Sequence, residues 1–170
     1  DAAAEIGVRF VVFPLVDNGS ITCPAEEEAL LAGLMPLRAC LVALGVKLIF
    51  ESDYPAERMK AFIGQFPDDA FGINYDIGNS AALGYNPTEE IACYGERIDN
   101  VHVKDRVLHG TTVPLGRGNA DFPAAFAALR KAGYAGNFIL QTARADDNQH
   151  ASVLTCYRRM TEDGWMQSGS

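Results

Sequence analysis

Five short apolar segments, rich in β-branched and aromatic residues, recur along the chain and are separated by longer mixed segments. They are Val8–Val16, Val46–Glu51, Gly72–Tyr75, Asn100–Val103 and Asn137–Leu140. Their apolar residues are continuous instead of alternating with polar ones, which is typical of parallel strands that helices cover on both faces. The pattern therefore predicts a parallel sheet and disfavours antiparallel hairpins.

Helix-like segments lie between these strands, at Ala25–Leu44, Pro55–Phe66, Pro87–Tyr94, Pro123–Ala132 and Ala151–Glu162. Most of them begin at a proline or an acidic residue, and several end at a glycine, as helices commonly do. Residues Asp1–Glu5 read as the last turn of a further helix that closes at Gly7. The alternation of strands and helices predicts an α/β fold, which we expect to form a single domain over residues 1–170.

The length of the chain limits how much of such a fold it contains. A complete (β/α)8 barrel needs about 250 residues, whereas this sequence has 170. We therefore expect a partial (β/α)8 TIM barrel of about five βα units. Five parallel strands cannot close a cylinder of eight, so each end of the sheet would expose an unpaired strand. A homo-oligomer is expected if the chain is complete, and a shortened chain is the alternative.

Composition and charge narrow the expected partners. The sequence is 48% hydrophobic and 21% charged, as in an ordinary soluble protein, and its formal charge of −8 disfavours nucleic acid as a ligand. No long uninterrupted apolar run and no signal-peptide pattern is present, so neither a membrane nor export is expected. The scattered cysteines have no C-x-x-C spacing, and we interpret them as reduced thiols of a cytoplasmic protein: Cys23, Cys40, Cys93 and Cys156.

A polar cluster directly follows each predicted strand. The clusters are Asp17–Asn18, Glu51–Asp53, Asp76–Asn79, His102–Arg106 and Gln141–Arg144. In parallel βα proteins the carboxyl ends of the strands meet at one face, and several strands contribute catalytic groups there. Glu51, Asp76 and His102 would then supply two carboxylates and one imidazole. These ligands suit Mn²⁺, Zn²⁺, Co²⁺ or Mg²⁺, and the ligand types alone leave the choice of metal open.

Simpler interpretations exist for each of these residues. An acidic residue at a strand end often caps the following helix, and Ser52, Asp53 and Asp76 all fit that role. His102 lies between two valines and also fits a core histidine that bonds a backbone carbonyl. The metal interpretation is favoured because three suitable groups occur at three successive strand ends.

Three motifs carry a family resemblance. The segments Phe50–Asp53, Tyr75–Ser80 and Val101–Asp105 resemble the ends of strands five, six and seven of xylose isomerase-like sugar phosphate isomerases and epimerases. The segments Gly116–Gly118, Asp121–Phe122 and Gly133–Gly136 are similar to the approach to strand eight in the same family. The resemblance covers nearly the whole chain and implies βα units four to eight of the barrel.

The resemblance assigns the family's metal ligands to Glu51, Asp76 and His102, and its fourth ligand, usually a glutamate, to Gln141. In the family's ketose epimerases the two metal-bound glutamates act as opposed acid and base. Gln141 cannot accept a proton, although its amide oxygen is still a metal ligand. The implied function is a metal-dependent isomerase or epimerase that acts through a cis-enediolate with Glu51 as the catalytic base, while two-base epimerisation is disfavoured.

The implied substrate is a small sugar or sugar phosphate. Asn79, Lys104 and Arg106 are expected to contact its hydroxyl or phosphate groups, and Arg117 is expected to approach an anionic group. Arg106 and Arg117 also fit the simpler role of solvated surface charges.

Two other functions stay open at this point. The first is a related barrel lyase or hydrolase that resembles inosose dehydratase or endonuclease IV. The endonuclease needs several metal-binding histidines, whereas this sequence has only His102, His109 and His150, and its acidic charge also counts against a nuclease. The second is a non-catalytic remnant or binding module, which Gln141 and the absent barrel units would favour.

Overall fold

A computed structural model describes residues 2–142 and 150–165 and contains the predicted parallel sheet. Its strands follow the order β1-β2-β3-β4-β7. They are β1 (Phe10–Leu15), β2 (Lys47–Ser52), β3 (Phe71–Asp76), β4 (Ile98–Val103) and β7 (Asn137–Leu140). Phe10 pairs with Lys47 in β1–β2, and Asn100 pairs with Asn137 in β4–β7, both in parallel register. The predicted α/β class is confirmed.

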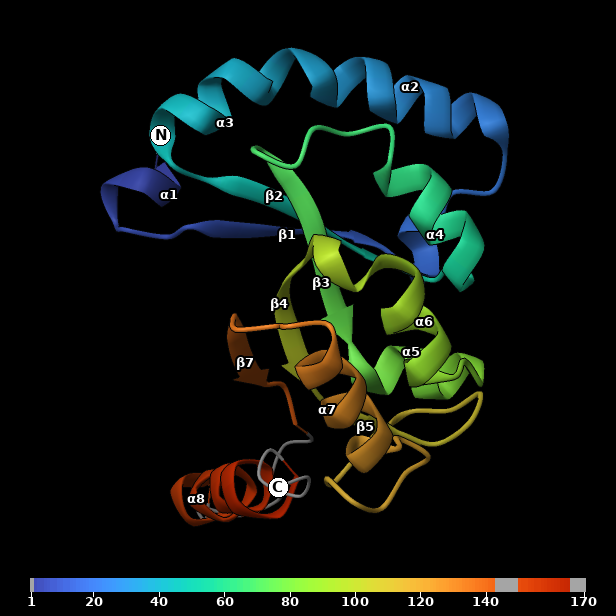
Figure 1. The fold of residues 1–170 in the computed structure, drawn as a ribbon, viewed down its shortest axis with the longest axis vertical. Helices are drawn as coiled ribbons and strands as arrows, with labels where there is room; N and C mark the ends of the chain where they lie inside the picture. The colour runs from blue at the N-terminus through green and yellow to red at the C-terminus, as the bar shows by residue number, and fades with distance from the viewer. Residues whose placement is uncertain (1, 143–149, 166–170) are drawn as a thin grey trace. The chain divides into compact units, whose positions relative to one another are not determined.

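The helices follow the strands as expected. They are α1 (Ala2–Glu5), α2 (Pro24–Leu34), α3 (Arg38–Leu44), α4 (Ala56–Ile63), α5 (Ile77–Leu83), α6 (Pro87–Tyr94), α7 (Phe122–Lys131) and α8 (His150–Arg159), with a π-helical turn at Met160–Trp165. Short 3₁₀ turns occur at η1 (Asp17–Gly19), η2 (Met35–Leu37) and η3 (Gly95–Arg97). The single helix predicted over Ala25–Leu44 is divided by η2, because Pro36 has no N–H to donate within a helix. Figure 1 shows α2 and α3 continuing one another across this turn.

Two elements were not predicted. The segment after Asp76 forms the short helix α5, whose run of small residues has little amphipathic periodicity. The strands β5 (Asp105–Arg106) and β6 (Thr112–Val113) form an antiparallel hairpin, against the expectation of no hairpins. Each of these strands has two residues, which is too short for an alternating pattern to be visible in the sequence.

Burial differs between the strands. Every residue of β3 is buried, as expected for a strand covered on both faces. The same expectation is wrong for β1 and β7, the first and last strands in the sheet order. Val11 is 41% exposed and Ile139 is 46% exposed. An edge strand has a neighbour on one side only, so its side chains are less completely covered.

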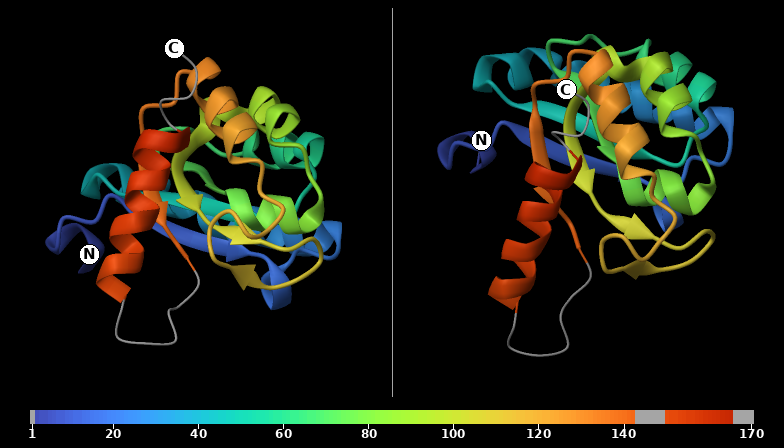
Figure 2. Two further views of the ribbon diagram at one scale, coloured as in Figure 1. Left: turned by 90° about the horizontal axis from the view of Figure 1, so that it is seen from below. Right: turned by 60° about the horizontal axis from the view of Figure 1, so that its bottom comes forward.

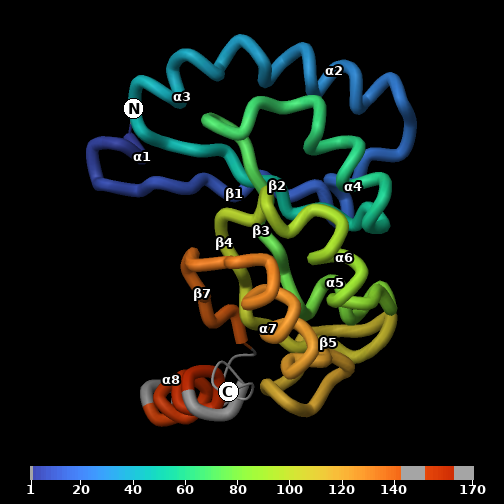
Figure 3. The backbone as a smooth tube through the Cα atoms, viewed as in Figure 1, coloured from blue at the N-terminus to red at the C-terminus, as the bar shows by residue number. Residues whose placement is uncertain are grey.

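The described residues form two compact units. The first consists of the residues up to Asn74 together with Arg97–Asp99. Its core is an aromatic cluster in which the Phe50 ring lies 5.1 Å from Phe62 and 4.9 Å from Phe66. The chain passes directly from α3 into β2 (Figure 3), because Gly45 ends the helix with a left-handed φ of 65°.

The second unit consists of Tyr75–Glu96 and the residues from Asn100 onward. Here α6 and α7 pack side by side, as Figure 2 shows. The rings of Phe126 on α7 and Phe138 on β7 lie 5.2 Å apart, and Phe122 and Leu129 are buried beside them on the same helix. These contacts fix the helix layer against β7 and thereby hold the ends of the strands in place.

All four cysteines are free thiols. Cys40 and Cys156 are exposed on their helices, so they do not serve as small core residues. Within residues 2–142 and 150–165, no helix has both the length and the apolar character that crossing a membrane would require.

Candidate metal centre

Glu51 lies near the carboxyl end of β2 and is buried. The strand places it beside β3, because Phe50 pairs with Ile73 in the β2–β3 register and Glu51 and Asn74 follow these two residues. Asn74 Nδ2 donates a hydrogen bond of 2.6 Å to Glu51 Oε2. This contact fixes the orientation of the Glu51 carboxylate. Asn74 was not predicted as a site residue, although a polar residue inside a buried strand, two positions before Asp76, was an available signal.

Asp76 ends β3 and is also the N-cap of α5. Its two oxygens have different partners. The backbone N–H of Asn79 donates to Oδ1 over 2.8 Å, which caps the helix. Oδ2 accepts a hydrogen bond of 3.2 Å from Lys104 Nζ and lies 3.7 Å from His102 Nδ1. Capping therefore occupies one oxygen of Asp76 and leaves the other facing Lys104 and His102.

His102 lies in β4 and is buried. Its Nδ1 is too far from Asp76 Oδ2 for a direct hydrogen bond, and the two atoms are spaced like two ligands around a common ion. Asp76 and His102, both in the second unit, offer a carboxylate and an imidazole that could hold a metal ion, and Glu51 in the first unit offers a second carboxylate. Two carboxylates and one imidazole fit Zn²⁺ or Mn²⁺, so the donor chemistry is consistent with the predicted metal.

Gln141, the predicted fourth ligand, follows β7 directly. Its backbone N–H donates to the Val103 carbonyl over 3.0 Å, which continues the pairing of β7 with β4. The residue is exposed. Its role as a metal ligand stays a prediction.

Asn79, Lys104 and Arg106, the predicted substrate contacts, lie together. Asn79 Oδ1 accepts hydrogen bonds from Lys104 Nζ over 3.1 Å and from Arg106 Nη1 over 2.8 Å. Arg106 Nε and Nη2 both donate to the Gly110 carbonyl, over 3.0 and 2.7 Å. These polar groups thus bond one another and the β5–β6 hairpin. Arg117 lies apart from this network in the part of the chain described, exposed in the loop after β6.

The fold has counterparts among known proteins. The family model for the xylose isomerase-like TIM barrel matches residues 1–160. The chain belongs to this xylose isomerase-like family. The predicted resemblance is confirmed.

Two curated relatives of this xylose isomerase-like chain are longer than the chain itself. The rhizopine catabolism protein MocC of Rhizobium meliloti is 28% identical over 194 residues, covering 92% of this chain and 58% of MocC. The inosose dehydratase of Geobacillus kaustophilus is 27% identical over 140 residues, covering 69% of this chain and 46% of that protein. The chain thus spans about half of the length of each relative.

Solved structures show the same fold. A xylose isomerase domain protein from Planctomyces limnophilus superimposes with a TM-score of 0.77 at 21% identity, covering 93% of this chain and 60% of that one. The IOLI protein, solved with a zinc atom, also gives 0.77, at 19% identity with coverage of 97% and 66%. An L-ribulose 3-epimerase gives 0.69 at 22% identity, with 90% and 55% covered. A partial TIM barrel is therefore confirmed as the fold.

The loop after β5 is organised around Asp105, which was not predicted as a site residue. Asp105 is fully buried, and its carboxylate accepts three backbone hydrogen bonds. The donors are the N–H groups of Gly116 and Gly118, both at 2.8 Å, and of Ala120 at 3.1 Å. A Cβ on Gly118 would overlap Asp105 Oδ1, so only glycine fits there. The carboxylate thereby fixes the loop that carries Arg117.

A second buried carboxylate, Glu90, lies on α6 away from the metal-ligand group. It accepts hydrogen bonds from the hydroxyls of Tyr75 and Tyr94, each at 3.0 Å, and from the Ser80 hydroxyl. Burial raises the pKa of Glu90, and the three hydroxyl donors partly oppose that rise. In the sequence Glu90 resembles an ordinary acidic residue of a first helical turn, so no pattern distinguishes it there.

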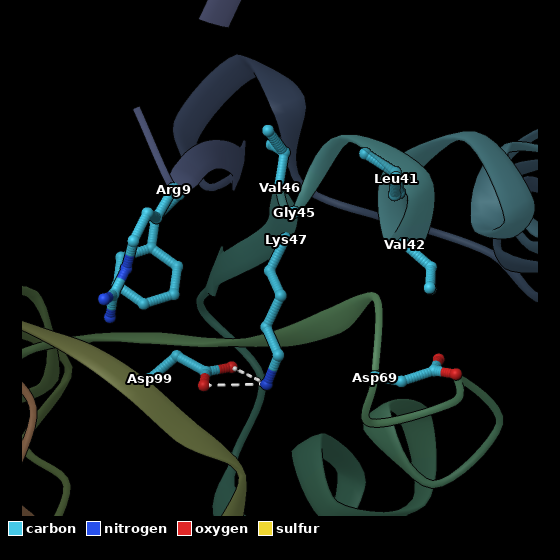
Figure 4. Close-up of a pocket in the computed structure, with 9 residues that line it drawn as sticks. Arg9, Leu41, Val42, Gly45, Val46, Lys47, Asp69 and Asp99 are labelled. Carbon is cyan, nitrogen blue, oxygen red and sulfur yellow. Dashed lines mark hydrogen bonds and ion pairs between the residues drawn. The ribbon is translucent and has the colours of Figure 1, made fainter. Parts of the chain in front are cut away.

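A pocket of about 290 Å³ lies in the first unit at the opposite ends of its strands (Figure 4). Lys47, at the start of β2, bonds both oxygens of Asp99 there, at 2.8 and 3.1 Å. Gly72 makes room for this pair, because a Cβ at that position would overlap Asp99 Oδ2. Family members carry their catalytic groups at the carboxyl ends of the strands, so we assign this pocket no catalytic part.

Proposed function

We propose that this chain belongs to a divalent metal-dependent isomerase or epimerase of small sugars or sugar phosphates. The observation that carries the proposal is the facing pair of Asp76 Oδ2 and His102 Nδ1, 3.7 Å apart, to which the proposal adds Glu51 as a third ligand. Further support comes from the zinc atom in the similar IOLI structure and from the similar L-ribulose 3-epimerase. Because the chain covers 58% of MocC, the activity is proposed for a protein that contains these residues.

The proposed reaction begins with removal of a proton from the carbon beside the substrate carbonyl. A bound Mn²⁺, Zn²⁺, Co²⁺ or Mg²⁺ would supply positive charge that stabilises the resulting cis-enediolate. Glu51 takes the proton, and the hydrogen bond from Asn74 holds its carboxylate in one orientation. Return of the proton to the neighbouring carbon gives an isomer, and return to the original carbon from the other face gives an epimer.

The residue at position 141 bears on which product is formed. Epimerisation by two bases needs a second proton carrier on the opposite side of the substrate, and a glutamine side chain cannot carry a proton at neutral pH. Gln141 therefore favours a single-base isomerase, in which Glu51 both removes and returns the proton. The amide oxygen of Gln141 remains suitable as a fourth metal ligand.

A dehydratase is the second candidate, because an inosose dehydratase is 27% identical over 69% of the chain. Its reaction would share the first step, in which Glu51 removes a proton beside the carbonyl. The enediolate would then expel the hydroxyl group of the next carbon as water, instead of recovering the proton on carbon. The two candidates therefore differ in whether the product has lost one water molecule.

The deciding experiment uses the full-length protein loaded with Mn²⁺ and incubated in D₂O with a panel of ketoses, ketose phosphates and inososes. An isomerase or epimerase forms a product of substrate composition with deuterium on carbon, seen by NMR. A dehydratase forms a product lighter by one water. Absence of turnover on the panel together with no stoichiometric divalent ion in the purified protein would contradict both candidates.

The substitution Glu51→Gln tests the role of the base. We expect turnover to fall by at least about a hundredfold, since a positioned acid–base group typically contributes 10²–10⁴ in rate. The fold should survive, because the glutamine amide can still accept the hydrogen bond from Asn74. Turnover is followed by the NMR assay and folding by circular dichroism. The matched control is Glu96→Gln at an exposed position. Undiminished turnover in Glu51→Gln would exclude Glu51 as the base.

A further inference from the structure

Lys104 forms a nearly buried ion pair with the proposed ligand Asp76. Lys104 Nζ lies 3.2 Å from Asp76 Oδ2, and the side chains of the two residues are 15% and 1% exposed. Its second hydrogen bond, of 3.1 Å, goes to Asn79 Oδ1. Shielding from water strengthens the Coulombic attraction between the two charges, so the ammonium is a close partner of this carboxylate.

Lys104 bonds the same Asp76 oxygen that a metal ion would need as its ligand. Asp76 Oδ1 is directed to the backbone N–H of Asn79, 2.8 Å away, where it caps α5. Oδ2 is the atom that faces His102 Nδ1, at 3.7 Å. A cation coordinated by both Asp76 and His102 would therefore bind Oδ2 and replace the contact with Lys104.

Lys104 is held in this position by packing as well as by charge. A Cβ on Gly78, in the first turn of α5, would lie 2.8 Å from Lys104 Cγ and 2.9 Å from its backbone carbonyl oxygen. Such distances are too short for any side chain, so the absence of one at position 78 lets β4 approach α5 closely. The lysine stem lies directly against the helix that Asp76 caps.

We propose that Lys104 is a built-in counter-ion of Asp76 that competes with the divalent cation for Oδ2 and thereby sets the metal affinity of the site. The inference rests on the proposed metal site. In the metal-free protein the ammonium balances the buried carboxylate, and each metal-binding event displaces it. The site is consequently tuned to bind its metal more weakly than its ligands alone would allow.

The test is calorimetric titration of the metal-free full-length protein with MnCl₂ and, separately, with ZnCl₂. Lys104→Met removes the competing charge, and we expect it to bind the metal at least about tenfold more tightly than the wild type. Lys104→Gln keeps a hydrogen-bond donor but has no charge, so it should also bind the metal more tightly. This second variant keeps the test valid if the methionine variant folds poorly. Lys104→Arg keeps the charge and should stay near the wild-type affinity. Lys131→Met, at an exposed position, is the matched control and should leave the affinity unchanged.

The outcomes separate this inference from the proposed function. If the wild type and all the variants bind no metal, the metal site itself is wrong. If the wild type binds but Lys104→Met and Lys104→Gln bind no more tightly, or if Lys104→Arg binds as tightly as they do, Lys104 is not a competitor. Weaker binding in Lys104→Met and Lys104→Gln would show instead that the lysine positions Asp76 for the metal, which also overturns the inference.

Discussion

At the scale of single residues, the two carboxylate oxygens of Asp76 have different partners. One oxygen caps α5, and the other faces Lys104 and His102. Capping fixes the rotation of the carboxylate, so the second oxygen is held in a defined direction. A residue that ends a strand and starts a helix is therefore well suited to present a ligand, because its backbone and half of its side chain are already constrained.

Glu90 gives a prediction on pH dependence. Its folded pKa is raised above the ordinary 4.5 by burial, so its stabilising contribution is present below that value and is lost as the pH rises through the folded pKa. We expect Glu90→Gln to gain thermal stability over the wild type as the pH increases from acidic to neutral. The check is the difference in melting temperature at the two conditions.

The exposed neighbour provides the control for this substitution. Glu89→Gln should show no pH-dependent difference from the wild type, because its side chain lies on the solvent side of α6. A Glu90→Gln variant whose stability changed with pH in parallel with the wild type would indicate that Glu90 stays in one protonation state over this range.

The candidate ligands could be named from the sequence, whereas the contacts that surround them could not. Glu51, Asp76 and His102 each follow a recognisable apolar run, and the convergence of parallel strand ends is a general property of the fold. Asn74 and Lys104 act through partners that are distant in sequence, at separations of 23 and 28 positions. Such pairings depend on strand register and rotamer, which hydrophobic periodicity does not contain.

At the scale of elements, the hairpin β5–β6 and the loop after it depend on Asp105. The substitution Asp105→Asn places an amide donor against backbone N–H groups that need an acceptor. We expect a loss of about 1–3 kcal/mol in the free energy of unfolding, the usual range for a buried group left without its partner. Urea denaturation measures the loss, and tryptic cleavage after Arg117 should become faster as the loop loosens.

Asp68→Asn is the matched control for this change, because it makes the same chemical substitution at an exposed position. Equal stability of the Asp105→Asn variant and the wild type would mean that the loop backbone is satisfied without the carboxylate.

Elements with a clear apolar run or clear end signals were predicted, whereas α5 and the β5–β6 hairpin were missed. The ranges Pro87–Tyr94 and Asn137–Leu140 agree with α6 and β7 at both ends. α5 was not predicted because the Asp76 cap and the close packing at Gly78 establish this helix, which has no apolar stripe. The hairpin is likewise established by contacts of Asp105 and Arg106 with a distant loop.

At the scale of the whole molecule, the order of the sheet places β1 and β7 at its two ends. Val11 on β1 is 41% exposed, and an exposed apolar edge strand favours pairing with another chain. We expect the purified chain of 170 residues to self-associate. The substitution Val11→Lys adds a charge to the edge strand and should shift the chain toward the monomer. Sedimentation velocity over a range of protein concentrations measures the effect.

Val42→Lys serves as the comparison for this edge variant, since Val42 is 48% exposed but lies on α3 instead of an edge strand. A similar shift in both variants would point to a general effect of added charge. A monomeric wild-type chain at all concentrations would contradict the proposed role of the β1 edge.

The alternation of β3 has a consequence for how this protein tolerates change. Successive side chains of a strand point in opposite directions, so Asn74 and Asp76 face one way while Tyr75 faces the other, toward Glu90. One residue inserted or deleted in this strand would exchange the two sets, turning a phenol toward the side that Asn74 and Asp76 now face and a carboxylate toward Glu90. Insertions and deletions should therefore be confined to the loops before and after β3. Within β3 the number of residues is fixed, because the side chains on both of its faces must keep their positions.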